Sequence, residues 1–332
     1  QVFNVAPTIS ANKVQLPIPC TDDLFRSQSA NEWRAIFGSS PKTALTWQPK
    51  ASNDIPSGLS GYAMYAVLSG FWLRILEAQH RLLNSQQEAV EQPGHILIPS
   101  QVFALDEEAR SIAPGLARMI DIYGHELPSA NVNIMTLWHF NCLAVTTNLG
   151  IIESAAGRSG PVAANEGINA LMQWADSSAA RRACLHASQI LVLMSNRKSS
   201  DGIMLHSEIA VFFAALVLGL YFMAAPEGAN LDEPALDLLV EIDWTLVGDE
   251  GLVTHSLSAE QTCSSPAAHF IRHGRPLCFS GVTYKTPYAA ARRVFMNFAT
   301  LLEDAGKWNV DRYCDILRII SDTLMESDGI SH

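Results

Sequence analysis

The chain has 332 residues, of which 48% are hydrophobic and 17% are charged. This balance excludes an intrinsically disordered chain, in which charge would dominate over apolar residues. The ordinary content of Gly (20) and Pro (16) excludes collagen-like and low-complexity classes. Lys and Arg total 22 against 33 Asp and Glu, a formal net charge of −11. Because an acidic surface repels phosphate, we do not expect this chain to hold DNA or RNA by itself.

Cysteine usage points to a reducing compartment. The six cysteines are widely spaced and form no C-x-x-C pair, and two of them, Cys142 and Cys184, lie inside apolar runs. We therefore expect packed, reduced thiols in an intracellular protein. The chain begins at Gln1 with no charged and apolar leader, which suggests a part of something longer.

Helical periodicity dominates the sequence. Apolar residues recur at three- and four-residue steps from Tyr62 to Leu83, and predict a long amphipathic helix over about 60–90. The acidic run 106–108 is expected in the first turn of the next helix, where it would suit the helix dipole. A further helix is predicted over 131–149.

The second half continues this pattern after a break at Gly157, Gly160 and Pro161. Asp176 or Ser177 is expected to cap a helix over 179–195. Further helices are predicted over 204–225, 231–247, 287–304 (capped by Thr286) and from Asn309 onward.

One apolar run tests whether the chain meets a membrane. Ile209–Ala225 is 17 residues without a charge, and it has no Lys/Arg cluster on either flank. Because a spanning helix needs about 20 apolar residues, a buried central helix is favoured and no membrane partner is expected.

The sequence therefore predicts an all-α fold, a single multi-helix domain with a large apolar core. Two stretches, 39–58 and 248–285, are expected to be irregular, and the second is long enough to be functional. Strand-like alternation is weak and confined to 95–98 and 277–282.

A search for catalytic motifs predicts no catalytic residue. Dinucleotide-binding, phosphate-loop, zinc-protease and nucleophile-elbow patterns are missing from the sequence. Gly58, Ser60 and Gly61 come close to the elbow, but the second glycine is one place too early. Asp22-Asp23 is better explained as the start of a helix than as a catalytic pair.

Four residues, Cys263, His269, His273 and Cys278, could together bind zinc. The two histidines are four residues apart and would share a helix face, and both residue types are good zinc ligands. Each cysteine lacks a close partner, however, and the region is expected to be irregular. Two exposed histidines and two buried thiols are the favoured alternative, so no metal site is assigned.

Other polar residues are expected to be structural. His139 and His186 lie in apolar helices and are interpreted as core imidazoles, each with one hydrogen bond to backbone or carboxylate. The pair Arg181-Arg182 could meet a phosphate or an acidic partner, but the solvated face of a helix is favoured.

Several segments resemble the fungal-specific transcription factor domain, also called the middle homology region. Leu16–Phe25 followed by Ser29–Trp33 is similar to the N-terminal segment of that family. The remaining matching segments, in chain order, are Thr136–Val145, Ile151–Arg158, Trp174 with Ala179–Ala187, Ala214–Tyr221, Phe270 with Gly281-Val282, and the series Ala291, Leu302 and Trp308. Gly219 departs from the pattern, because relatives often carry Trp there.

The resemblance covers about 16–325, with the N-terminal segment at 16–38 and a helical core at 60–325. It is closest to regulators in which zinc fingers of the Cys2His2 type precede this domain. It implies an all-helical regulatory and dimerisation domain in the nucleus that contacts itself and transcription co-regulators. DNA would be bound only through zinc fingers expected upstream, and no cofactor is expected in this segment itself.

Two other functions stay open. A ligand-sensing receptor domain could bind an apolar metabolite in the core, lined by Trp72, Phe140, Phe212, Phe213 and Tyr221, although these residues are expected simply to fill the core. An all-α enzyme of unfamiliar type has no motif in its support.

Overall fold

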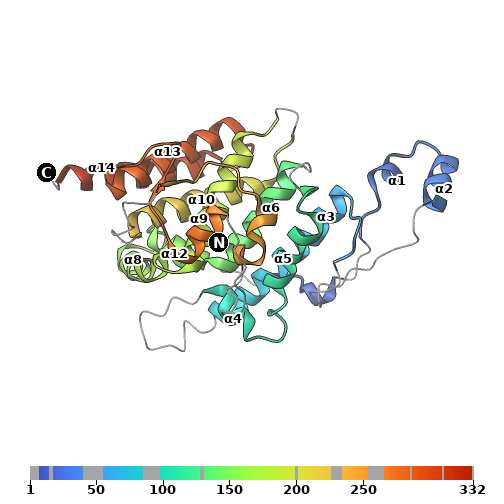
Figure 1. Cartoon of the computed structure of the whole chain (residues 1–332), viewed down its shortest axis with the longest axis horizontal. Coiled ribbons are helices and arrows are strands. Elements are labelled where there is room, and N and C mark those ends of the chain that lie inside the picture. Colours follow the sequence, from blue (N-terminus) through green and yellow to red (C-terminus); the bar gives the residue numbers. More distant parts are fainter. Residues whose placement is uncertain are drawn as a thin grey trace.

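A computed structural model describes residues 7–14, 18–39, 55–84, 98–127, 131–198, 201–225, 234–252, 265–284, 286–308 and 310–330. Within these ranges the backbone is mostly helical, and the apolar residues form one continuous core. The predicted all-α fold is therefore confirmed. Figure 1 shows a body of stacked helices with the N-terminal helices, in blue, standing away from it.

Three helices make up the centre of this body. They are α6 (Val132–Thr146), α9 (Ser178–Ser195) and α10 (Leu205–Ala224), and each packs against the other two. Side-chain caps fix where two of them begin. The Asn131 side chain accepts the N–H of Asn133 before α6, and Ser177 accepts the N–H of Ala180 before α9.

The helix α10 is the uncharged run that the sequence places at the centre. Among the described helices it is the one that is long and apolar enough to cross a membrane by length and composition. In the fold, however, 78% of its most apolar window is buried inside the protein. It is thus a core helix, as its length and flanks predict.

A layer formed by α3 (Gly61–Ala78) and α5 (Ile112–Tyr123) covers α6. After Ala78 the predicted long helix continues as a π-helical segment, η2 (Gln79–Asn84). A short helix, α4 (Pro99–Ala104), packs against η2 and α6.

The acidic run 106–108 is not in the first turn of α5, so that prediction is wrong. It lies in the turns that precede Ile112. The Asp106 carboxylate accepts the backbone N–H groups of Glu108 and Ala109, and such local bonds compete with helix formation.

Two helices flank the glycine break. They are α7 (Leu149–Ala155) and α8 (Pro161–Ala175), which pack on each other. Sequence analysis missed α8, although Gly160 with φ of 90° followed by Pro at the first helical position is a typical helix start.

The C-terminal hairpin consists of α13 (Pro287–Ala305) and α14 (Val310–Ile330), which lie side by side at one edge of the body in red (Figure 1). Thr286 caps α13 by accepting the N–H of Ala289, as predicted. The predicted opening residue of the last helix, Asn309, lies outside the described residues. The buried Glu208 carboxylate of α10 accepts the N–H groups of Lys307 and Trp308, which ties the turn of the hairpin to the core.

The described part of the predicted helix over 231–247, residues 234–247, is not one helix, which corrects the sequence prediction. Strand β1 (Leu236–Asp237) pairs in parallel with β2 (Leu277–Cys278), and a single helical turn follows, α11 (Trp244–Val247). The cause is a contact with a helix that is distant along the chain. The buried Gln189 amide on α9 donates to the carbonyl of Val240 and accepts the N–H of Ile242. These hydrogen bonds satisfy backbone groups that a helix would otherwise pair, so this stretch can stay non-helical.

The predicted irregular segment 248–285 is interrupted by structure. It begins with η4 (Gly248–Gly251) and contains α12 (Pro266–His273), while residues 253–264 lie outside the described part. Of the two strand-like stretches, 277–282 contains β2 and a bridge between Phe279 and Val282. The other, 95–98, falls mostly outside the described residues.

The N-terminal segment forms η1 (Ala11–Lys13), α1 (Asp22–Arg26) and α2 (Ala30–Ser39). Helix α1 begins at Asp22, so the acidic pair is at a helix start as predicted. On α2 the rings of Trp33 and Phe37 stack with centroids 4.7 Å apart, and both side chains are exposed.

Candidate functional site

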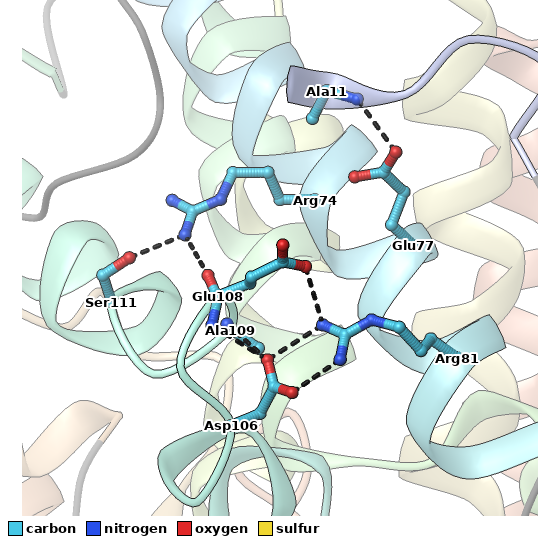
Figure 2. Close-up of polar contacts among 8 residues, drawn as sticks. All are labelled: Ala11, Arg74, Glu77, Arg81, Asp106, Glu108, Ala109 and Ser111. Carbon is cyan, nitrogen blue, oxygen red and sulfur yellow. Dashed lines mark hydrogen bonds and ion pairs between the residues drawn. The ribbon is translucent and has the colours of Figure 1, made fainter. Parts of the chain in front are cut away.

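A polar pocket of about 790 Å³ lies between the last turns of α3, the acidic turns before α5 and the N-terminal segment. Figure 2 shows polar contacts among some of the residues in and next to it. The residues that line it are Pro7, Ser10, Ala11, Arg74, Glu77, Ala78, His80, Arg81, Glu107, Glu108, Ala109 and Ile112.

Arg74 is the most buried charged side chain of this pocket. Only 7% of the residue is exposed. Its Nη2 donates to the backbone carbonyl of Glu108 over 2.7 Å and to the Ser111 hydroxyl over 2.6 Å (Figure 2). Burial lowers the pKa of Arg74, while the nearby carboxylates of Glu77 and Glu108 act in the opposite direction. A guanidinium stays protonated all the same, so α3 delivers a fixed positive charge to the pocket.

Arg81, seven residues further along, holds the acidic turn in place. Its two terminal nitrogens contact the two Asp106 carboxylate oxygens at 2.5 and 2.8 Å, and the Glu108 carboxylate lies 3.3 Å away. The hydrogen bond from Arg81 lowers the pKa of Asp106 to about 2, and backbone N–H groups add to this effect. Both charges of this bidentate pair are therefore matched within the turn.

The third wall comes from a distant part of the chain. The backbone N–H of Ala11 donates to a Glu77 carboxylate oxygen over 2.9 Å, although the two residues are 66 positions apart (Figure 2). Ala11 is buried by this contact. The N-terminal segment thus closes the pocket against the end of α3.

This arrangement is suited to binding a polar ligand. It offers a buried guanidinium and several carboxylates within one cavity. Sequence analysis did not select Arg74, Glu77 or Arg81. The available signal was their spacing of three and four residues, which places three charges on one face of an otherwise apolar helix.

The core also contains a pair of histidines in direct contact. His139 on α6 and His186 on α9 are fully buried, and their Nδ1 atoms are 2.9 Å apart. The Nε2 of His186 lies 3.1 Å from the carbonyl of Gly251. Since a carbonyl can only accept, His186 carries its proton on Nε2 and its Nδ1 accepts from His139.

This geometry requires His186 to be neutral, because its Nδ1 accepts the hydrogen bond. Burial lowers the pKa of His186 to about 3, and burial together with the neighbouring imidazole lowers the pKa of His139 well below its usual value. The indoles of Trp138 and Trp244 pack around the pair, and the Trp244 ring stacks on His186 at 4.2 Å between centroids. The prediction of core imidazoles is confirmed, with His139 bonded to the other histidine.

Arg182 is not on a solvated face, so the preference is wrong for this residue, whereas Arg181 is half-buried. Arg182 is buried and donates to the carbonyl of Glu250 and to the Ser178 hydroxyl. Arg181 donates to the carbonyl of Ile271 over 2.9 Å, near the C-terminus of α12, where unpaired carbonyls favour a cation. The two side chains attach the segment after α11 and the helix α12 to the core.

Among the described residues, no third ligand lies with His269 and His273 to complete a zinc site. His269 and His273 are exposed on α12 with ring centroids 4.8 Å apart, as their spacing predicts. Cys278 is a buried thiol of β2, and Cys263 lies outside the described residues. Within the described ranges, no three His, Cys, Asp or Glu side chains are grouped so that they could hold a metal ion.

The five aromatic residues proposed to line an apolar cavity pack on other rings. Trp72 stacks on Phe140 at 4.6 Å, and Phe213 lies against both Phe140 and Phe212. Tyr221 contacts the ring of Trp174. All five belong to the core or pack against it, and none of them lines the polar pocket.

No protein-family model, curated protein or solved structure matches this chain. The likeness to the fungal transcription factor domain therefore depends on the quoted segments alone.

Proposed function

We propose that this chain is the regulatory and dimerisation domain of a fungal zinc-finger transcription factor that controls transcription by RNA polymerase II. It would act in the nucleus, contact a second copy and co-regulators, and leave DNA binding to zinc fingers elsewhere in the protein. It would carry no catalytic residues of its own.

The observation that carries this proposal is where the resembling segments lie. Residues 136–145, 151–158, 179–187 and 214–221 fall on α6, on and just after α7, on α9 and on α10. These are the helices that pack together in the core, with α10 touching the other three. A likeness at residues that pack on one another is what a shared helical core would produce, because core positions constrain residue type most strongly.

The character of the buried polar residues adds support. Glu208, Gln189, Arg182 and the histidine pair all bind backbone groups or each other within the core. Side chains of this kind specify the packing of one helix on another.

The experiment is a reporter assay in yeast with the chain fused to an unrelated DNA-binding domain. We expect reporter transcription to change several-fold relative to the DNA-binding domain alone, upward for an activator and downward for a repressor. A fusion carrying Phe295→Asp, which places a charge in the core, is the matched control and should lose the effect.

An unchanged reporter with a folded, nuclear fusion would overturn the regulatory role. Sedimentation of the chain at micromolar concentration checks the second part of the proposal, since a dimer has twice the 36.2 kDa mass of one chain. A monomer at these concentrations would contradict the dimerisation part of the proposal.

The second candidate is a ligand-sensing domain, and the polar pocket is the observation in its favour. The sequence predicted an apolar ligand site in the core. The pocket found in the structure instead lies at the end of α3 and has a charged lining. Sensing at that pocket is compatible with the regulatory role.

A further inference from the structure

We propose that the pocket at the end of α3 binds a small zwitterion with a free carboxylate and a free ammonium group, of the size of an amino acid or a short peptide. Arg74 would receive the carboxylate, and Glu77 with Glu107 would receive the ammonium group. This inference concerns binding by the chain itself and does not depend on the proposed role in transcription.

Among the described residues, the donors of the Arg74 guanidinium are incompletely paired. A guanidinium has five N–H donors in a fixed plane. The two on Nη2 are taken by the Glu108 carbonyl and the Ser111 hydroxyl, and no described residue accepts from Nε or Nη1. A buried cation whose donors are only partly used favours an anionic partner, and a carboxylate matches its geometry.

A surplus of negative charge surrounds this guanidinium. Glu77, Glu107 and Glu108 line the same pocket. The Glu108 carboxylate lies 3.3 Å from Arg81, whose charge is already paired with Asp106. Glu77 has one oxygen bound to the Ala11 N–H, and Glu107 is exposed. These carboxylates would repel a phosphate or a dicarboxylate and would attract an ammonium group.

Both charges are held by one helix. Arg74 and Glu77 are three residues apart on α3, and both line the pocket. In Figure 2 the Arg74 side chain extends toward Ser111 and the Glu77 side chain toward Ala11. A ligand with a single charge would satisfy one of them and oppose the other. A zwitterion satisfies both.

The size of the cavity agrees with this class of ligand. Pockets that bind small molecules span roughly 300–1,000 Å³, and this one measures about 790 Å³. That volume admits a free amino acid together with water, or a short peptide.

The test is a thermal-shift and calorimetric screen of the chain against the common L-amino acids, each alone, and the dipeptide Ala-Ala. We expect at least one of these probes to bind. The N-acetylated form and the C-terminal amide of that probe, which each lack one charge, should bind about tenfold more weakly or worse.

Variants then locate the site. Arg74→Met and Glu77→Gln should each weaken binding about tenfold or more, because each removes one half of the charge complement. Arg110→Met is the matched control, since Arg110 is an exposed arginine in the same turn region and does not line the pocket. If Arg74→Met does not fold, Glu107→Gln is tested in place of that variant, since Glu107 is exposed. It should weaken binding of the probe that carries both a free carboxylate and a free ammonium group.

Three results would overturn the proposal. They are no binding by any probe at millimolar concentration, equal binding of the acetylated or amidated forms, and binding that survives the pocket variants. A silent reporter together with amino-acid binding would overturn the transcription role alone, so the two failures are distinguishable.

Discussion

At the scale of single residues, buried polar side chains do most to distinguish this core from a generic apolar one. Gln189 fixes the path of the chain at 240–242, Glu208 fixes the turn between α13 and α14, and Arg182 fixes the segment after α11. Each satisfies backbone groups that would otherwise be buried without a partner, at a cost of about 1–3 kcal/mol per group.

The His139–His186 pair predicts how stability depends on pH. The folded state holds both pKa values below that of an unfolded imidazole, near 6.5, so the unfolded chain takes up protons that the folded chain excludes. The stability that the neutral pair contributes is fully present above about pH 6.5 and falls as the pH drops below it. The free energy of unfolding should decrease by up to about 1.4 kcal/mol per pH unit for each imidazole, and the loss from His186 continues toward pH 3.

Urea unfolding at a series of pH values between 7.5 and 4.5 measures this slope. The double variant His139→Asn/His186→Asn should have a flatter slope, whatever its absolute stability. His273→Asn, at an exposed position on α12, should leave the slope unchanged. An equal slope in the double variant would show that other groups cause the pH dependence.

At the scale of elements, the close approach of α10 and α13 depends on a glycine. A Cβ built on Gly219 would lie 2.3 Å from the ring of Phe295, which is completely buried and has no room to move. The Phe295 ring therefore fills the volume that a larger side chain at position 219 would need.

Gly219→Ala should therefore destabilise the fold by about 1–3 kcal/mol, because the extra methyl overpacks the α10–α13 contact. Chemical denaturation measures the loss. Gly202→Ala is the control and should be nearly neutral, since nothing lies within 4 Å of its Cβ position. The double variant Gly219→Ala/Phe295→Leu should recover part of the loss, and a neutral Gly219→Ala would contradict the packing described here.

Elements with a strong helical period were predictable from the sequence, and those shaped by tertiary contacts were not. The helices α6, α9, α10 and α13 begin within about two residues of their expected starts, because caps such as Ser177 and Thr286 act locally. The strand β1 was missed, because its pairing with β2 joins Leu236 to Leu277, far along the chain.

At the scale of the whole molecule, the net charge of −11 sets how the chain meets nucleic acid. We expect no mobility shift of double-stranded DNA by this chain even at low salt, where attraction to phosphate would be strongest. A fusion to an unrelated DNA-binding domain should shift the site of that domain and serves as the positive control. Specific binding by the chain alone would contradict the proposal that DNA recognition lies elsewhere in the protein.

The sequence by itself determined the fold class, the central apolar helix and the burial of both histidines, because periodicity and composition act over a few neighbouring residues. Only the tertiary structure decided which distant groups meet. It joined Glu77 to Ala11, His139 to His186 and Arg182 to Glu250. The polar pocket belongs to this second class, since its three walls come from separate stretches of chain, and the charge left over in a cavity depends on packing that no local pattern records.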